Sequence, residues 1–211
     1  MFGFRVIVVG LAILGARPIS AQNGPDVPFA TILMVRFDSL RQDTLIAQRT
    51  HANTALELLG AVKHDALGRI SDEQLLRFGR LFGRSLGAAK VETCADMHRK
   101  GIAAGFVALA MEMDSALALG WADFMEDMVW ASVLDRPIGP RVSAAEVTAA
   151  YRVLAEQLTP DKQRSFRRGY DKTGSAEDIC YFARIAFGEL ALAPKANAAA
   201  VLRAAMFGSV P

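Results

Sequence analysis

The stretch SDEQLLRFGRLFGRS, residues 71–85, has the features of the start and body of an amphipathic helix. Ser71 is a favourable N-cap residue, and Gln74 three positions later completes a capping box. The apolar residues that follow recur at intervals of three and four and share one side of the helix: Leu75, Phe78, Phe82 and Leu86. The basic residues on the opposite side are Arg77, Arg80 and Arg84. The stretch therefore predicts a capped helix with a buried apolar face and an exposed basic face.

A similar stretch, TPDKQRSFRRGYDKT, occupies residues 159–173. Phe78 and Arg80 have identical counterparts at the equivalent positions Phe166 and Arg168. Each stretch follows another predicted helix and leads into a helix that carries one cysteine. Two interpretations stay open. In the first, the chain contains two related three-helix units, within residues 52–119 and 143–207. In the second, the two stretches are unrelated helices that are alike because both are capped and both bury one apolar face.

The first residues of these helices, ISDEQ (70–74) and LTPDK (158–162), resemble the LTxxQ motif of small periplasmic helical chaperones and stress sensors. The resemblance covers five residues in each copy, and the second copy departs from the motif at Lys162. The physical content of the motif is a helix cap, which unrelated proteins need equally. We therefore assign no family from it.

Helical periodicity extends over nearly all of the chain, and no Asn-Gly or Asp-Gly hairpin joins alternating runs. Residues 29–37 are open to either a helix or a strand. A break is predicted at DRPIGPR, residues 135–141, because its two prolines and glycine cannot continue a helix. The predicted helices cover residues 52–67, 71–86, 89–119 with a bend near Gly101 and Gly105, 121–134, 144–158, 159 onwards, 176–192 and 195–207. The expected fold is all-α, a single domain over residues 22–211 with about seven or eight helices.

Residues 1–21 have the layout of a secretory signal peptide. Arg5 precedes an uninterrupted apolar run over residues 6–16, and the small residue Ala21 precedes the expected cleavage site. Two features are atypical: Arg17 directly follows the apolar run, and Ile19 stands where a small residue is preferred. We expect export to the periplasm or the medium and a mature chain that begins near Gln22.

Export changes the charge balance of the chain. Loss of Arg5 and Arg17 with the signal reduces the 24 basic residues to 22, which equals the 22 acidic ones. A neutral chain has no global field that would gather nucleic acid, so we expect no nucleic-acid partner. No later segment is apolar over the length that a bilayer requires, so we expect no transmembrane anchor after cleavage.

Cys94 and Cys180 are the two cysteines of the chain. In an oxidising compartment they predict an intramolecular disulfide that staples the helices. Two free thiols or a metal site are the alternatives. For the metal site, His98 shares a helix face with Cys94, and His51 or His64 would complete the ligands. Because no CxxC or HxxxH pair accompanies them, we predict neither a metal nor another cofactor, and we expect His98 to be a partly buried polar residue.

The sequence contains no motif that identifies a catalytic site. A cluster of acids has the composition for a catalytic pair or a calcium site, without the spacing of an EF-hand loop: Glu112, Asp114, Asp123, Glu126 and Asp127. We therefore expect a non-catalytic binding protein, with a hydrolase or metal-dependent enzyme as the alternative. A pocket that gathers acids, His98 or hydroxyl groups would favour the enzyme, and a flat exposed patch would favour binding.

The candidate partner-binding residues are Arg77, Arg80, Arg84 and Trp130. The arginines would suit an envelope protein or another anionic surface, although a solvated helix face has the same composition. Trp130 lies among acidic residues, on the side of its predicted helix (121–134) opposite a continuous row of apolar residues. It therefore predicts either an interaction surface or a helix that is packed on both sides.

Overall fold

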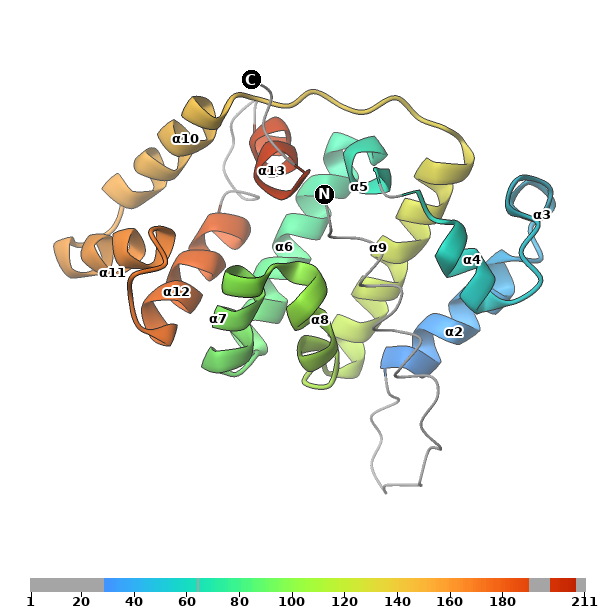
Figure 1. Ribbon diagram of the computed structural model, residues 1–211, viewed down its shortest axis with the longest axis horizontal. Coiled ribbons are helices and arrows are strands. Elements are labelled where there is room, and N and C mark those ends of the chain that lie inside the picture. Colours follow the sequence, from blue (N-terminus) through green and yellow to red (C-terminus); the bar gives the residue numbers. More distant parts are fainter. Residues whose placement is uncertain (1–28, 64, 190–197, 208–211) are drawn as a thin grey trace.

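The computed structural model describes residues 29–63, 65–189 and 198–207, and in these ranges it contains helices and no strand (Figure 1). This confirms the all-α prediction, with more helices than expected because several predicted segments are divided. The elements are α2 (Phe29–Leu40), α3 (Thr44–Thr50), α4 (Ala55–Ala61), α5 (Ala66–Arg69), α6 (Asp72–Ala88), α7 (Val91–Lys100), α8 (Ile102–Ala110), α9 (Ser115–Val133), α10 (Ala144–Glu156), α11 (Pro160–Tyr170), α12 (Ala176–Arg184), the π-helical segment η1 (Ile185–Glu189) and α13 (Ala198–Phe207).

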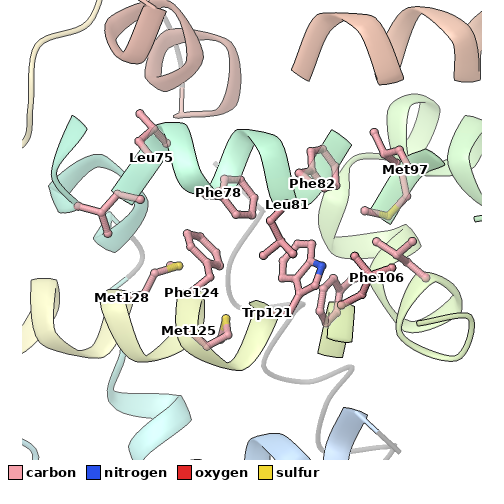
Figure 2. Close-up of a cluster of buried hydrophobic side chains, with 14 of the residues drawn as sticks. Leu75, Phe78, Leu81, Phe82, Met97, Phe106, Trp121, Phe124, Met125 and Met128 are labelled. Carbon is pink, nitrogen blue, oxygen red and sulfur yellow. The ribbon is translucent and has the colours of Figure 1, made fainter. Parts of the chain in front are cut away.

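The helix predicted from Ser71 is α6, and it lies at the centre of the fold. The capping box is present: Gln74 N–H donates to Ser71 Oγ, and Ser71 N–H donates to Gln74 Oε1. The predicted apolar face of α6 is buried, with Phe78 pointing toward the long helix α9 (Figure 2) and the rest of the helix also packing on η1 and α13. Buried apolar side chains from α2 through α13 join this interface in one cluster.

Trp121 of α9 occupies the middle of this cluster. Its ring is surrounded by Phe78, Phe82, Phe106 and Phe124, with centroid separations between 4.8 and 6.1 Å. The indole Nε1–H donates to Ser85 Oγ at 2.9 Å, so the polar atom of this buried side chain is satisfied. The pairing of α6 with α9 therefore combines apolar burial with one specific hydrogen bond.

Residues 29–40 form a helix, which resolves the choice between helix and strand that the sequence left open. Phe29, Leu33, Phe37 and Leu40 recur at helical intervals and are buried. This face packs against α9 and α4, and the helical period of the apolar residues decides the conformation despite the β-branched residues between them.

The prediction of one helix over residues 52–67 is wrong, because the chain forms the two short helices α4 and α5. Thr54 caps α4, with its side chain accepting from Glu57 N–H, and the backbone becomes extended at Val62. Leu58 and Leu59 of α4 are buried, while Leu56 is 44% exposed.

The predicted helix over residues 89–119 is also divided. Gly101 has φ of 89°, a conformation that favours glycine, and it separates α7 from α8 at the predicted bend. Asp114 then caps α9 by accepting from Leu117 N–H. Residues 115–119 therefore belong to the same helix as residues 121–133.

Cys94 of α7 and Cys180 of α12 form the predicted disulfide, with their Cα atoms 5.2 Å apart. The helices that carry them pack along each other. Reduced thiols and a cysteine–histidine metal site are therefore wrong for this pair.

The two similar stretches share burial but not partners. Phe78 and Phe166 are both buried, yet Phe166 packs on Phe182 of α12 whereas Phe78 packs on α9. Likewise, α11 packs closely along α12, while α6 packs mainly on η1, α13 and α9. The likeness therefore extends to single helices rather than to their packing.

Two glycines allow the closest helix contacts. A Cβ at Gly83 of α6 would lie 2.5 Å from the Cα of Gly188 in η1, and a Cβ at Gly169 of α11 would lie 2.2 Å from the carbonyl oxygen of Asp178 in α12. Neither distance is compatible with a side chain, and in both cases the obstructing atom is backbone. Glycine at these two positions sets how near the helices lie.

A fully buried arginine, Arg203 of α13, joins three segments of the chain. Its guanidinium donates to the carbonyl oxygens of Pro140 at 2.9 Å and Ile70 at 3.1 Å, and to Asp72 Oδ1 at 2.8 Å. It therefore ties α13 to the Pro-rich segment 135–141 and to the start of α6.

Candidate functional site

A cavity of about 650 Å³ lies among α6, α7, α10, α11, α12, η1 and α13, on the side of the molecule opposite α2, α3 and α4 (Figure 1). Its volume falls within the range of small-molecule sites in proteins. Most of its lining is apolar, with aromatic rings from Phe82, Phe182, Phe187, Tyr151 and Tyr170. The exposed residues on its rim include Ala144, Thr148 and Lys172.

Phe182 of α12 organises one wall of the cavity. The ring centroids of Tyr151 and Tyr170 both lie 5.5 Å from that of Phe182, and the His98 imidazole lies 4.9 Å from it. Edge-to-face arrangements of this kind are favourable between aromatic side chains. The wall is therefore held by contacts between α7, α10, α11 and α12.

His98 of α7 lines the cavity with an unpaired polar atom. Its Nε2 is buried and has no hydrogen-bond partner. Burial, and secondarily the charge of Lys172, lower the pKa of His98 to about 4. The imidazole is therefore neutral near pH 7, and its Nε2 is left without a hydrogen bond. The sequence indicated a partly buried polar residue here, and the structure agrees.

Lys172 contributes the charge at this cavity. Among the lining residues that the structure describes, it alone carries a formal charge at neutral pH. It forms no ion pair or side-chain hydrogen bond within the described residues, and it is exposed. The position of Lys172 at the cavity was not predicted from the sequence.

A second cavity of about 420 Å³ lies between α10 and α11. Thr148, Tyr151 and Tyr170 line both cavities. Burial, together with Tyr170, raises the pKa of Tyr151, so its hydroxyl stays protonated. The rim of the second cavity carries charges of both signs, from Arg152, Glu156, Arg167 and Asp171.

The disulfide braces two walls of the larger cavity. On α7, His98 lies one turn after Cys94. On α12, Phe182 and Ala183 follow Cys180 within the next turn. The covalent bond therefore fixes the separation of the two helices from which these lining side chains project.

The candidate partner-binding residues differ in their exposure and in their partners. Arg77 forms an ion pair with Asp127 of α9, which also accepts from Gln74. Arg80 and Arg84 are exposed and form no ion pair with any described residue. Trp130 is half-buried and packs against the core, which agrees with a helix that is packed on more than one side.

The five acids that were considered as a catalytic pair or a calcium site hold helices together instead. Arg36 of α2 bonds both Asp123 and Glu126, and Arg77 bonds Asp127. Glu112 accepts from Lys90 N–H and Thr93 Oγ1 at the start of α7, and Asp114 caps α9. Each of these acids thus has a structural role.

Within the described residues, no group of three His, Cys, Asp or Glu side chains is arranged to hold a metal ion. His64, one of the histidines considered as a ligand, lies outside the described residues, as do residues 1–28 with the expected signal peptide. None of the described helices combines the length and apolar composition needed to span a bilayer. Comparison of the chain with protein-family models, with curated proteins and with solved structures found no match.

We expect the substitutions Arg80→Glu and Arg84→Glu each to change the free energy of unfolding by less than about 0.5 kcal/mol, because both side chains are exposed. Arg77→Glu is the matched comparison on the same helix. It places a second carboxylate against Asp127 and should cost about 1 kcal/mol. Urea denaturation of the three variants measures these values. A loss of several kcal/mol at Arg80 or Arg84 would contradict their exposure.

Proposed function

We propose that the protein is an exported, non-catalytic binding protein that holds a small, mainly apolar ligand in the larger cavity. The observation that carries the proposal is an aromatic-lined volume of about 650 Å³ whose lining includes His98, a residue with a buried and unpaired Nε2. An unsatisfied buried polar atom costs about 1–3 kcal/mol. A ligand with one hydrogen-bonding group would recover that cost while burying its apolar part.

Export is supported by the layout of residues 1–21 and by the Cys94–Cys180 bond, which is compatible with an oxidising compartment. Surface partners such as an envelope protein or an anionic surface remain a separate proposal for the exposed Arg80 and Arg84. The cavity has the more specific chemistry, so we favour ligand binding in the cavity over surface binding by the arginines.

A hydrolase is the second candidate, because the neutral His98 and the hydroxyl-bearing Thr148 both line this cavity. A histidine that acts as a general base is usually oriented by a carboxylate or another acceptor. Among the described residues, no Asp or Glu lines this cavity. The arrangement therefore suits binding better than proton transfer.

The test uses two neighbouring alanines in the first turn of α10. Ala144 and Ala145 are both exposed, but only Ala144 lines the cavity. We expect the neutral fluorescent probe N-phenyl-1-naphthylamine to bind the mature protein with one-to-one stoichiometry. Ala144→Trp should weaken this binding about tenfold or more by filling the rim, and Ala145→Trp should leave it unchanged.

Absence of saturable binding, or equal effects of the two variants, would contradict the proposal. Hydrolysis of a short-chain p-nitrophenyl ester that is abolished by His98→Gln, with the fold retained, would instead establish the enzyme. Both measurements use the same purified protein, so they separate the two candidates directly.

A further inference from the structure

Lys172 adopts a backbone conformation that lysine rarely takes. It has φ of 59° and follows the C-cap residue Asp171 of α11. Lys172 N–H donates to Gly169 O, and Thr173 N–H donates to Arg168 O, which is the hydrogen-bond pattern of a Schellman motif. The residue at this position is usually glycine, because a Cβ is unfavourable there. Lysine is therefore less favourable than glycine for the backbone conformation at this position.

Asp135 shows how this chain uses a non-glycine residue in the same motif. It has φ of 48° after α9, and Arg136 N–H donates to Ala131 O while Asp135 N–H donates to Ser132 O. Its carboxylate bonds Lys63 and Arg69. The strained position therefore carries a charge with a partner, whereas the charge of Lys172 has none among the described residues.

The polar groups of the cavity favour an anion. The ammonium of Lys172 is uncompensated, because no acid among the described residues lines the cavity. His98 lines the same cavity and is neutral, so its imidazole can add an uncharged N–H donor. One ammonium and one N–H match the two oxygens and the single charge of a carboxylate. A phosphate would bring further charge to an otherwise apolar wall.

We propose that the ligand is an amphiphile with one carboxylate, whose acid group bonds Lys172 and His98 while its apolar body lies among the rings of Phe82, Phe182 and Phe187. The inference rests on the proposed function, since it names the ligand class of the same cavity. It adds a role for Lys172 that binding of a purely apolar molecule does not require.

The test compares four probes of equal chain length: decanoate, decanol, decyl phosphate and decyltrimethylammonium. Calorimetric titration of the wild-type protein should rank decanoate first and the ammonium last. Lys172→Gly and Lys172→Asn suit the left-handed backbone and remove the charge. Both should weaken decanoate about tenfold, as expected for a charge-assisted hydrogen bond, and change decanol by less than about twofold.

Lys162→Ala is the matched control, since it removes the same charge from an exposed position on α11 that lines neither cavity. It should leave all four affinities unchanged. Thermal unfolding of Lys172→Gly should occur at the wild-type temperature or above, because the substitution relieves the left-handed lysine. Weaker binding of decanoate can then not be attributed to unfolding.

The failures of the two proposals are distinguishable. If none of the four probes binds, the proposed function fails. If decanol binds as tightly as decanoate, or if decyl phosphate or the ammonium binds more tightly, the cavity binds ligands but the carboxylate inference is wrong. Equal losses in Lys172→Gly and Lys162→Ala would also overturn it.

Discussion

Replacing Arg203 by leucine will lower the free energy of unfolding by about 3–4 kcal/mol. Leucine keeps an apolar volume in α13 but leaves the carbonyl oxygens of Ile70 and Pro140 without their donor. The Ile70 contact is buried, so leaving its oxygen without a partner costs about 1–3 kcal/mol, and the partly buried Pro140 oxygen adds less. Urea denaturation monitored by circular dichroism measures the loss, and the start of α6 and the segment 135–141 should lose hydrogen-exchange protection first.

Asp72→Asn is the control for this prediction. The Asp72 side chain is 59% exposed, so its ion pair with Arg203 is largely screened by water. Its loss should cost about 1 kcal/mol or less. If Asp72→Asn costs as much as Arg203→Leu, the ion pair rather than the two carbonyl contacts stabilises this junction.

Removing the disulfide with the double substitution Cys94→Ala and Cys180→Ala will lower stability by about 2–5 kcal/mol. The bond joins residues separated by 86 positions, so in the chain-entropy model its loss greatly enlarges the unfolded ensemble. The variant should also bind N-phenyl-1-naphthylamine more weakly, because α7 and α12 no longer hold the cavity walls at a fixed separation.

The matched measurement for the disulfide is denaturation of the wild-type protein with and without reductant. Both routes should give the same loss, since each removes the same cross-link. A double variant that unfolds within about 1 kcal/mol of the oxidised protein would show that packing between α7 and α12 suffices to hold them together.

Those parts of the fold that depend on local sequence were predictable. The cap at Ser71, the buried face of α6 and the break at residues 135–141 follow from side-chain chemistry within a few positions. The prediction failed for residues 52–67, where the backbone becomes extended at Val62 and divides the segment into α4 and α5. It also misplaced the start of α9. That helix is buried on several sides and therefore lacks one distinct apolar face.

The candidate site was less predictable because it depends on packing between distant segments. His98 was recognised as partly buried, but nothing in the local sequence brings it to Lys172. A signal for Arg203 was present: it is the one charge within the apolar run 198–206. A charge in such a run indicates a buried partner, although only the fold shows that the partners are Ile70, Asp72 and Pro140.

The close helix contacts at Gly83 and Gly169 also restrict how the sequence can diverge. At either position any other residue would have to push two backbones apart, so substitutions should be eliminated even as surface positions drift. Gly188 is different. A Cβ there would lie 3.6 Å from the Cα of Gly83, which is an ordinary van der Waals contact, so alanine should be tolerated at this position. Distant homologues should therefore retain Gly83, Gly169 and the cysteine pair, with the same spacing along the sequence, even where the overall sequence identity is low.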